Sequence, residues 1–236
     1  MDNLEQKIAN YKPPNKVKQI LDQSKTIFLV GITGAGKDTV MNELLKNSYY
    51  HQIISHTTRA PRANHGVMEI NGADYHFIDQ HEAQRMLENN EFVEAKFAHG
   101  NVYGTSIAEL EKAHSGGSIA IADIEVQGVA EYCALSSNVI PIFLLPPSFD
   151  VWMGRLSSRY KDQMDNTELT KRLNTAKAEL KEALGKSYFE YVVNDDLALT
   201  VKITNEVAHG SFSKKKNAES KKLAQKLLED LNSHLG

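Results

Sequence analysis

Short apolar runs recur along the chain and alternate with longer stretches that suit helices. The runs lie at residues 27–30, 52–55, 118–123, 139–144 and 191–194. A run that is apolar at nearly every position is typical of a strand buried on both faces, and strands that alternate with helices favour a parallel sheet. The pattern therefore predicts an α/β fold in which helices flank a parallel sheet.

Between residues 55 and 103 the pattern is different. Residues 75–78 and 92–95 alternate more between apolar and polar side chains, as in strands with one exposed face. The sequence that joins them is polar and typical of a loop. We expect an antiparallel insertion in the parallel sheet here. A second, charged and irregular insertion is expected at residues 160–167, between two helical stretches.

The two ends of the chain differ from the middle. Near the N-terminus, Pro13 and Pro14 interrupt any helix, and we expect two short amphipathic helices there, with apolar positions at Leu4, Ile8, Val17, Ile20 and Leu21. The C-terminal tail has three lysines, 214–216, followed by Leu223, Leu227, Leu228 and Leu231 at helical spacing. A solvated amphipathic helix fits this tail better than a basic patch for phosphates, which stays the alternative.

Composition narrows the class of protein. The chain has 236 residues, of which 41% are hydrophobic and 24% charged, as in soluble globular proteins. No apolar run approaches the ~18 residues that span a bilayer, and the polar first residues lead us to expect no signal segment. The net charge of −3 gives no case for nucleic-acid binding, and the lone Cys133 suits a reducing, cytoplasmic compartment. The oligomeric state stays open.

A phosphate-binding loop follows the first apolar run. Its spacing is G-x-x-x-x-G-K, and it lies between a predicted strand and a predicted helix, which is the context that such a loop requires. Backbone N–H groups in this loop would surround an anion, and the lysine would reach the β- and γ-phosphates. We therefore expect a nucleoside triphosphate at Gly31, Ile32, Thr33, Gly34, Ala35, Gly36 and Lys37.

The residue after Lys37 departs from the motif. Ser or Thr at this place normally coordinates Mg²⁺, whereas this chain has Asp38, followed by Thr39. Asp38 could meet the metal directly or through water, or it could point away while waters complete the coordination. A third alternative is that the site has lost metal binding.

Two arginines follow the second apolar run, in the segment S-H-T-T-R-A-P-R from Ser55 to Arg62. Adjacent guanidinium groups such as those of Arg59 and Arg62 suit a dianionic phosphate, which each can hold through paired N–H donors. Taken alone, the segment could also be a surface loop with salt bridges.

Further motifs come in a specific order. They are G-A-D-Y-H-F at 72–77, F-V-E at 92–94, G-N-V-Y-G-T-S at 100–106, D-I-E-V-Q-G at 123–128 and F-L-L-P-P-S at 143–148. Together with S-H-T-T-R-A-P-R, this ordered set resembles guanylate kinases, from about residue 25 to residue 198. Each piece is weak alone, but their order and spacing make the match specific.

The resemblance implies a division of the chain. A guanylate kinase-like domain would occupy 25–204, with its core at 25–54, 106–154 and 173–204. A mixed-β GMP-binding subdomain would be inserted at 55–105, and a small helical lid would occupy 155–172. Residues 1–24 would form an N-terminal extension and residues 205–236 a C-terminal helical tail.

The resemblance also implies an acceptor site. The phosphate of GMP would be held by Arg59, Arg62, Tyr75 and Tyr103, and the base would be read by Ser55, Glu94 and Thr105. An ionised Glu94 can accept from both N1–H and N2–H₂ of guanine, whereas adenine offers no donor at N1. Two departures matter. The loop that precedes Tyr75 is about four residues longer than usual, and Glu125 stands where the family has a second aspartate in D-I-D, so its contact with guanine or metal is open.

Donor-side and catalytic residues are implied in the same way. Asp123 ends an apolar strand and would face the phosphates and Mg²⁺, with Asp38 and Thr39 as the other candidate metal-site residues. Arg155 and Arg159 share a helix face and, with Arg172, resemble the lid arginines of the family. These arginines, Lys37 and Asp123 would form the catalytic set, while Asn194 would contact the adenine of ATP.

The implied activity is transfer of the γ-phosphoryl group from ATP to GMP, and to dGMP, with Mg²⁺ as cofactor. ATP and GMP would be the partners, without nucleic acid or membrane. Two alternatives stay open: a nucleoside monophosphate kinase with another base preference, and a catalytically weak guanylate-kinase-like binding module.

Overall fold

A five-stranded sheet carries the phosphate loop, in the strand order β11-β10-β1-β9-β2. The strands are β1 (Thr26–Val30), β2 (Tyr50–Gln52), β9 (Ile119–Asp123), β10 (Val139–Leu145) and β11 (Glu190–Val193). β10 runs parallel to both β1 and β11. Every residue of β1 is buried, as expected for a strand covered on both faces. The predicted α/β fold with a parallel sheet is confirmed.

The computed structural model describes residues 4–64, 67–160 and 165–236. The chain divides into two compact units, and the boundary falls within β9. Unit 1 comprises Met1–Ser24 and Tyr49–Ala120, and unit 2 comprises Lys25–Ser48 and Ile121–Gly236. The N-terminal extension thus belongs to unit 1, together with all of residues 55–105.

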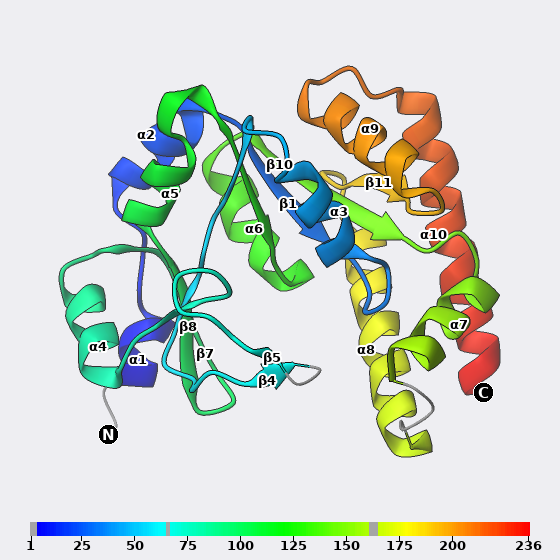
Figure 1. Cartoon of the computed structure of the whole chain (residues 1–236), viewed down its shortest axis with the longest axis horizontal. Coiled ribbons are helices and arrows are strands. Elements are labelled where there is room, and N and C mark those ends of the chain that lie inside the picture. Colours follow the sequence, from blue (N-terminus) through cyan, green and yellow to red (C-terminus); the bar gives the residue numbers. More distant parts are fainter. Residues whose placement is uncertain (1–3, 65–66, 161–164) are drawn as a thin grey trace. The chain divides into compact units, whose positions relative to one another are not determined.

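Unit 2 contains six helices among its described residues: α3 (Lys37–Leu44), α6 (Val126–Leu135), α7 (Phe149–Tyr160), α8 (Asn166–Leu184), α9 (Leu197–Ala208) and α10 (Lys214–Leu235). α3 packs on β1 and α9, and α6 packs on β10 and α8. The tail helix α10 runs along α8 and β11 (Figure 1). Its apolar face is buried at Ala224, Leu227 and Leu231. The predicted tail helix is therefore present, and it is packed on the core along one face.

Unit 1 contains a four-stranded sheet in the order β6-β3-β8-β7. The strands are β3 (His56–Thr57), β6 (His76–Phe77), β7 (Phe92–Ala98) and β8 (Asn101–Ser106). β8 is antiparallel to β7 and β3, whereas β3 and β6 are parallel, so the insertion is mixed. A short hairpin of β4 (Ala63–Asn64) and β5 (Val67–Met68) precedes β6. After β8 come α5 (Ile107–Ala113) and the 3₁₀ turn η1 (Ser115–Gly117).

The N-terminal extension forms the two expected helices, α1 (Leu4–Ala9) and α2 (Asn15–Gln23), on either side of the two prolines. α1 packs on β7 and on α4 (Gln80–Glu88), and α2 packs on α5. Ile8 joins an apolar cluster that also contains Ala83, Met86, Leu87, Phe92 and Val102. The buried side chains of α2 are Val17, Ile20 and Leu21.

Three local predictions were wrong. The polar segment before β7, expected as a loop, forms α4, because Asp79 caps its first turn and Ala83, Met86 and Leu87 bury one face. The strand expected at 52–55 ends at Gln52, because the Ile54 N–H bonds to the Glu109 carboxylate instead of a neighbouring strand. Residues 166 and 167, expected in an irregular insertion, open α8 behind the Asp165 cap; residues 161–164 lie outside the described residues.

Candidate nucleotide-binding sites

The phosphate loop adopts a conformation that requires glycine at two places. Gly31 and Gly36 have φ values of 146° and 92°, which side-chain-bearing residues rarely adopt. A Cβ atom at Gly31 would lie 2.5 Å from the carbonyl oxygen of Leu144, and one at Gly36 would lie 2.3 Å from the side-chain nitrogen of Asn194. The loop therefore approaches the backbone of β10 and the side chain of Asn194, the residue after β11, too closely for a larger residue at these two positions.

One contact within the loop and several from distant residues hold the loop in place. Lys37 Nζ donates to the Gly31 carbonyl at 2.8 Å, and Trp152 Nε1 donates to the Thr33 carbonyl at 2.7 Å. Asn194 Nδ2 donates to the Ala35 carbonyl at 2.8 Å, and its Oδ1 accepts from Thr200 Oγ1. The loop side chains of Ile32 and Ala35 are completely buried, so these two residues can offer a ligand little beyond their backbone.

Trp152 and Thr200 were not predicted from the sequence. Asn194 was predicted to contact adenine, but its hydrogen bond to the phosphate loop was not predicted. Trp152 is the one tryptophan of the chain, in a helix that also carries two candidate arginines. A large aromatic residue with a buried N–H needs an acceptor, but nothing local identifies Thr33, which lies 119 positions away.

A cavity of about 360 Å³ opens over the loop in unit 2. It brings together most of the predicted donor-site residues, being lined by Gly34, Gly36, Lys37, Asp38, Thr39, Arg155, Arg159, Asn194, Asp195 and Leu197. Arg155 Nη2 donates to the Asn194 carbonyl at 2.9 Å, while its Nη1 is buried without a partner among the described residues. The cavity thus combines phosphate-loop backbone with three cationic side chains.

Arg172 lines a different cavity of unit 2, of about 300 Å³, with Thr33 and Glu179 among its neighbours. Its Nη2 atom lies 2.8 Å from a Glu168 carboxylate oxygen, and its guanidinium carbon is 4.5 Å from the centre of the Tyr160 ring. The structure therefore does not bring Arg172 into the cavity that Arg155 and Arg159 line.

Carboxylates gather near Lys37. Asp123 keeps an exposed surface at the end of β9, yet the protein packed around it raises the pKa of its carboxyl to about 6. Lys37 opposes that rise, while Asp38 and Glu125 add to it. Burial likewise raises the pKa of Glu179, a residue missed by sequence reasoning, to about 7. A cation bound beside these groups would relieve their mutual repulsion, so the residues present suit a divalent ion.

In unit 1, Arg59 is the centre of the predicted acceptor site. Its side chain is 8% exposed and forms two hydrogen bonds with the Glu69 carboxylate, at 2.7 and 2.9 Å. Its guanidinium carbon lies 5.3 Å from the centre of the Tyr75 ring, and the Tyr75 and Tyr103 rings are 6.3 Å apart. Arg59, Tyr75 and Tyr103 therefore meet, as predicted.

Glu69 organises this cluster and was missed in the sequence. Besides binding Arg59, it accepts from the Arg62 backbone N–H at 2.7 Å, and Arg59 holds the pKa of the Glu69 carboxyl below its usual range. Arg62 itself is exposed. The hairpin β4–β5 lies in the segment that is expected to be longer than usual, with residues 65–66 outside the described residues. Tyr75 lies beside Arg59.

The residues predicted to read the base lie in the same small sheet. Glu94 and Thr105 are opposite each other on β7 and β8, and the Thr105 N–H donates to a Glu94 carboxylate oxygen at 3.1 Å. Ser55 immediately precedes β3, and its carbonyl accepts from the His76 N–H. Glu125 belongs to unit 2.

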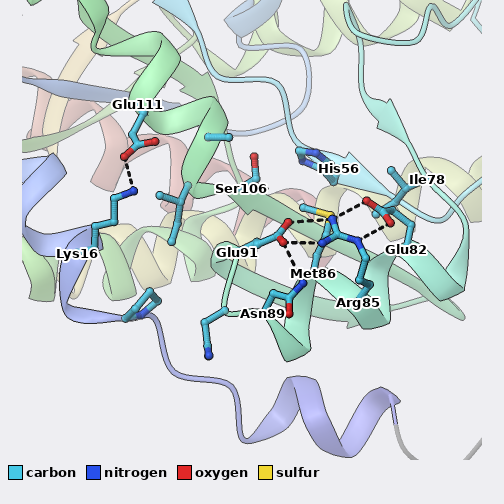
Figure 2. Close-up of a pocket in the computed structure, with 14 residues that line it drawn as sticks. Lys16, His56, Ile78, Glu82, Arg85, Met86, Asn89, Glu91, Ser106 and Glu111 are labelled. Atoms are coloured by element: carbon cyan, nitrogen blue, oxygen red, sulfur yellow. Dashed lines mark hydrogen bonds and ion pairs between the residues drawn. The ribbon is translucent and has the colours of Figure 1, made fainter.

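A further cavity of unit 1, of about 620 Å³, lies outside the predicted sites. Figure 2 shows Arg85 between Glu82 and Glu91, and Lys16 paired with Glu111. Lys16 is paired with one carboxylate and Arg85 with two, so these groups leave one negative charge in excess and offer no free cation to the phosphates of a nucleotide. His56 lines it with a partly buried ring that stacks on His76 at 4.6 Å.

We expect His56 to make stability depend on pH. Burial, and then the charge of His76, lower the pKa of His56 to about 4 from a usual 6.5, although Glu109, Glu82 and Glu91 oppose the shift. The unfolded chain therefore binds a proton more readily, so the free energy of unfolding should be highest above pH 6.5 and fall as the pH drops toward 4.

Urea unfolding of the wild type and of His56→Asn across this range measures the effect. The variant should lose less stability on acidification. His51→Asn, at an exposed histidine of the same unit, serves as the control and should keep the wild-type slope. Identical slopes for wild type and His56→Asn would contradict the prediction.

The described residues give little support to a metal site made of protein ligands alone, to a thiol nucleophile or to a membrane-spanning helix. They contain no group of three or more His, Cys, Asp or Glu side chains arranged to hold a metal ion by themselves. Cys133 is half-buried, and burial raises the pKa of its thiol to about 11, which leaves it protonated near neutral pH. Within the same part of the chain, the helices are too short or too polar to span a bilayer.

Comparison with known proteins identifies the family. A sequence model described as guanylate kinase matches residues 23–209. Guanylate kinase 1 of Oryza sativa subsp. japonica is 38% identical over 176 residues, which cover 73% of this chain and 44% of that protein. Guanylate kinase of Geobacter sulfurreducens is 36% identical over 172 residues, covering 72% of this chain and 80% of that protein.

The fold agrees with these matches. A crystal structure of guanylate kinase from Anaplasma phagocytophilum superimposes with a TM-score of 0.58 and 26% identity, covering 81% of this chain and 88% of that one. The chain spans less than half the length of the plant relative and most of the length of the bacterial one. With the phosphate loop in one unit and the arginine–tyrosine cluster in the other, the chain belongs to the guanylate kinase family.

Proposed function

We propose that this protein transfers the γ-phosphoryl group of ATP to GMP, and to dGMP, giving ADP and GDP. One observation carries the proposal. At the four-stranded sheet of unit 1, the cluster of Arg59 (just after β3), Tyr75 (just before β6) and Tyr103 (in β8) suits a phosphate. The Glu94–Thr105 pair on β7 and β8 of the same sheet suits a base with adjacent N–H donors. Among the common bases, guanine presents such donors at N1 and N2.

The acceptor phosphate would be held by Arg59 and Arg62, with the hydroxyl groups of Tyr75 and Tyr103. Arg59 is already oriented by Glu69, so little side-chain freedom would be lost when the phosphate binds. Ser55, Glu94 and Thr105, all of unit 1, would contact the guanine.

The donor triphosphate would occupy the cavity over the phosphate loop. Backbone N–H groups of residues 31–37 and the Lys37 ammonium would neutralise its charge, and Asn194 would border the adenine. Arg155 and Arg159 line this cavity, and Arg172 follows them on α8. We propose that residues 155–172 act as a lid whose closure delivers these cations to the transferring group.

Catalysis would depend on positioning and on charge neutralisation. A phosphate oxygen of GMP is already ionised near neutral pH, so no general base is needed. Family members generally use Mg²⁺ with ATP, and Asp38, Thr39 and Asp123 would hold it directly or through water, where it would supply positive charge beside the triphosphate. Asp38 lines the cavity with Lys37, which places a cation close enough to offset its charge.

An ADP-release assay over GMP, dGMP, AMP, CMP and UMP tests the proposal, with a Glu94→Gln variant beside the wild type. Turnover should be highest with GMP and dGMP. The variant should lose about tenfold or more in kcat/KM for GMP, because an amide can accept from only one side of its head group.

The two alternatives predict other outcomes. High turnover with a different monophosphate would indicate another base preference, and GMP binding without turnover would indicate a binding module. Either result would contradict the proposed activity. The cytoplasm is the compartment that we propose, as a reduced Cys133 suggests.

A further inference from the structure

We propose that the N-terminal segment, residues 4–23, positions the guanine-reading Glu94 through a hydrogen bond from the Tyr11 hydroxyl to the backbone of β7. Residues 4–22 lie outside the region that the family model matches. The inference rests on the proposed function, because it assigns this segment a part in recognising the acceptor base.

The contact itself is direct and shielded. Tyr11 Oη donates to the Phe92 carbonyl at 2.6 Å, across 81 positions of sequence. The Tyr11 ring packs against the apolar cluster that contains Ile8 and the completely buried Phe92. Burial raises the pKa of the Tyr11 hydroxyl, so this group stays a proton donor near neutral pH. The bond therefore joins the segment after α1 to the first residue of β7.

The bond falls where β7 is irregular. Phe92 pairs with Ser106 and Glu94 pairs with Thr105, so Val93 is an extra residue on β7. Such a bulge changes the direction in which the following side chains point, and the local ladder is weakened. Tyr11 holds the carbonyl immediately before the extra residue, two positions from Glu94. The direction of the Glu94 carboxylate thus depends on a backbone segment that the extension supports.

Other contacts hold the same end of β7 from α4. The Glu91 carboxylate accepts from Arg85 at 2.6 and 3.0 Å and from Asn89 at 3.2 Å. Figure 2 marks these contacts with dashed lines. The Glu91 N–H donates to the Met86 carbonyl, and the Glu91 carbonyl accepts from the Ile107 N–H. Glu91 is therefore fixed independently of Tyr11. Removal of the Tyr11 hydroxyl should loosen the backbone after Glu91 and leave the strand in place.

The consequence is specific to the base. Glu94 is proposed to accept from N1–H and from the 2-amino group of guanine, and two bonds to one carboxylate require a well-defined direction. IMP has the same phosphate, ribose and N1–H but lacks the 2-amino group. A misdirected Glu94 should therefore weaken recognition of GMP more than that of IMP.

Steady-state kinetics of Tyr11→Phe with GMP and with IMP test the inference. The substitution keeps the ring and its packing and removes the hydroxyl. We expect the KM for GMP to rise about fivefold, the ratio of kcat/KM for GMP over IMP to fall by a similar factor, and the KM for ATP to stay unchanged.

Lys7→Met is the matched control. It removes the ion pair between Lys7 and Glu88, a contact of the same extension with α4 that lies away from the bulge. This variant should keep the wild-type ratio of GMP to IMP. Melting temperatures of both variants establish that they are folded at the assay temperature.

Three outcomes would overturn the inference: an unchanged ratio in Tyr11→Phe, an equal rise in KM for GMP and IMP, or the same fall in ratio in Lys7→Met. Turnover of the wild type with GMP tests the proposed function separately. If the wild type does not turn GMP over, the proposed function is contradicted. If the wild type turns GMP over normally and Tyr11→Phe behaves like the wild type, only this inference is contradicted.

Discussion

Replacing Lys37 by alanine is expected to lower turnover by about a hundred- to a thousandfold while the affinity for GMP stays close to that of the wild type. Lys37 lines the donor cavity of unit 2, and its ammonium bonds to the Gly31 carbonyl of the phosphate loop. A cation directed at the transferring group stabilises charge that develops in the transition state, and removal of one such group has effects of about this size. The rate of ADP release measures turnover. Calorimetric titration with GMP, in the absence of ATP, measures the affinity for GMP.

Lys46→Ala is the control for this experiment. Lys46 lies just beyond α3, the helix that begins at Lys37. It pairs with Glu43 at 2.6 Å and has a largely exposed side chain. Its loss should leave turnover unchanged. Normal turnover in Lys37→Ala would contradict the assignment of residues 31–37 as the triphosphate site.

Replacing Arg59 by alanine is expected to weaken GMP binding by about ten- to a hundredfold. Charge-assisted hydrogen bonds contribute roughly 1.5–3 kcal/mol each, and every 1.4 kcal/mol is about tenfold in affinity. Arg59 is held by Glu69 beside the Tyr75 ring, so its guanidinium is oriented before any ligand arrives. Titration of GMP alone measures the effect, since donor-site residues take no part.

The same substitution leaves the partly buried carboxylate of Glu69 without its charged partner. The side chains of Arg59 and Glu69 are 8% and 9% exposed, but Glu69 as a whole residue is only partly buried, so the loss of stability should be smaller than the roughly 3–5 kcal/mol of a fully buried pair. The double variant Arg59→Ala/Glu69→Gln removes the stranded charge. It should recover part of the lost melting temperature while GMP binding stays weak. Wild-type affinity in a folded Arg59→Ala variant would rule out the proposed role.

The part of the site that was predictable consists of contiguous segments. The phosphate loop was predictable because its glycines, lysine and flanking strand and helix follow one another directly, and chain order forces them into one turn. The Glu94–Thr105 pair and the Arg59–Tyr75–Tyr103 cluster came from a resemblance, because β-strand pairing between separate segments has no local signature. Glu69 was missed for the same reason: a single carboxylate, here between Met68 and Ile70, is indistinguishable from a solvated one until its arginine is placed.

The amino-acid sequence alone determined the α/β class, the two N-terminal helices and the tail helix, since apolar periodicity and prolines act over a few residues. The tertiary structure decided which hydrogen bonds join segments that lie far apart in the sequence. Trp152 reaches Thr33 across 119 positions, Asn194 reaches Ala35 across 159, and Tyr11 reaches Phe92 across 81. A side-chain donor has many backbone carbonyls that it could bind equally well. Which one it binds depends on how the whole chain packs, because packing determines which carbonyl lies buried beside the donor.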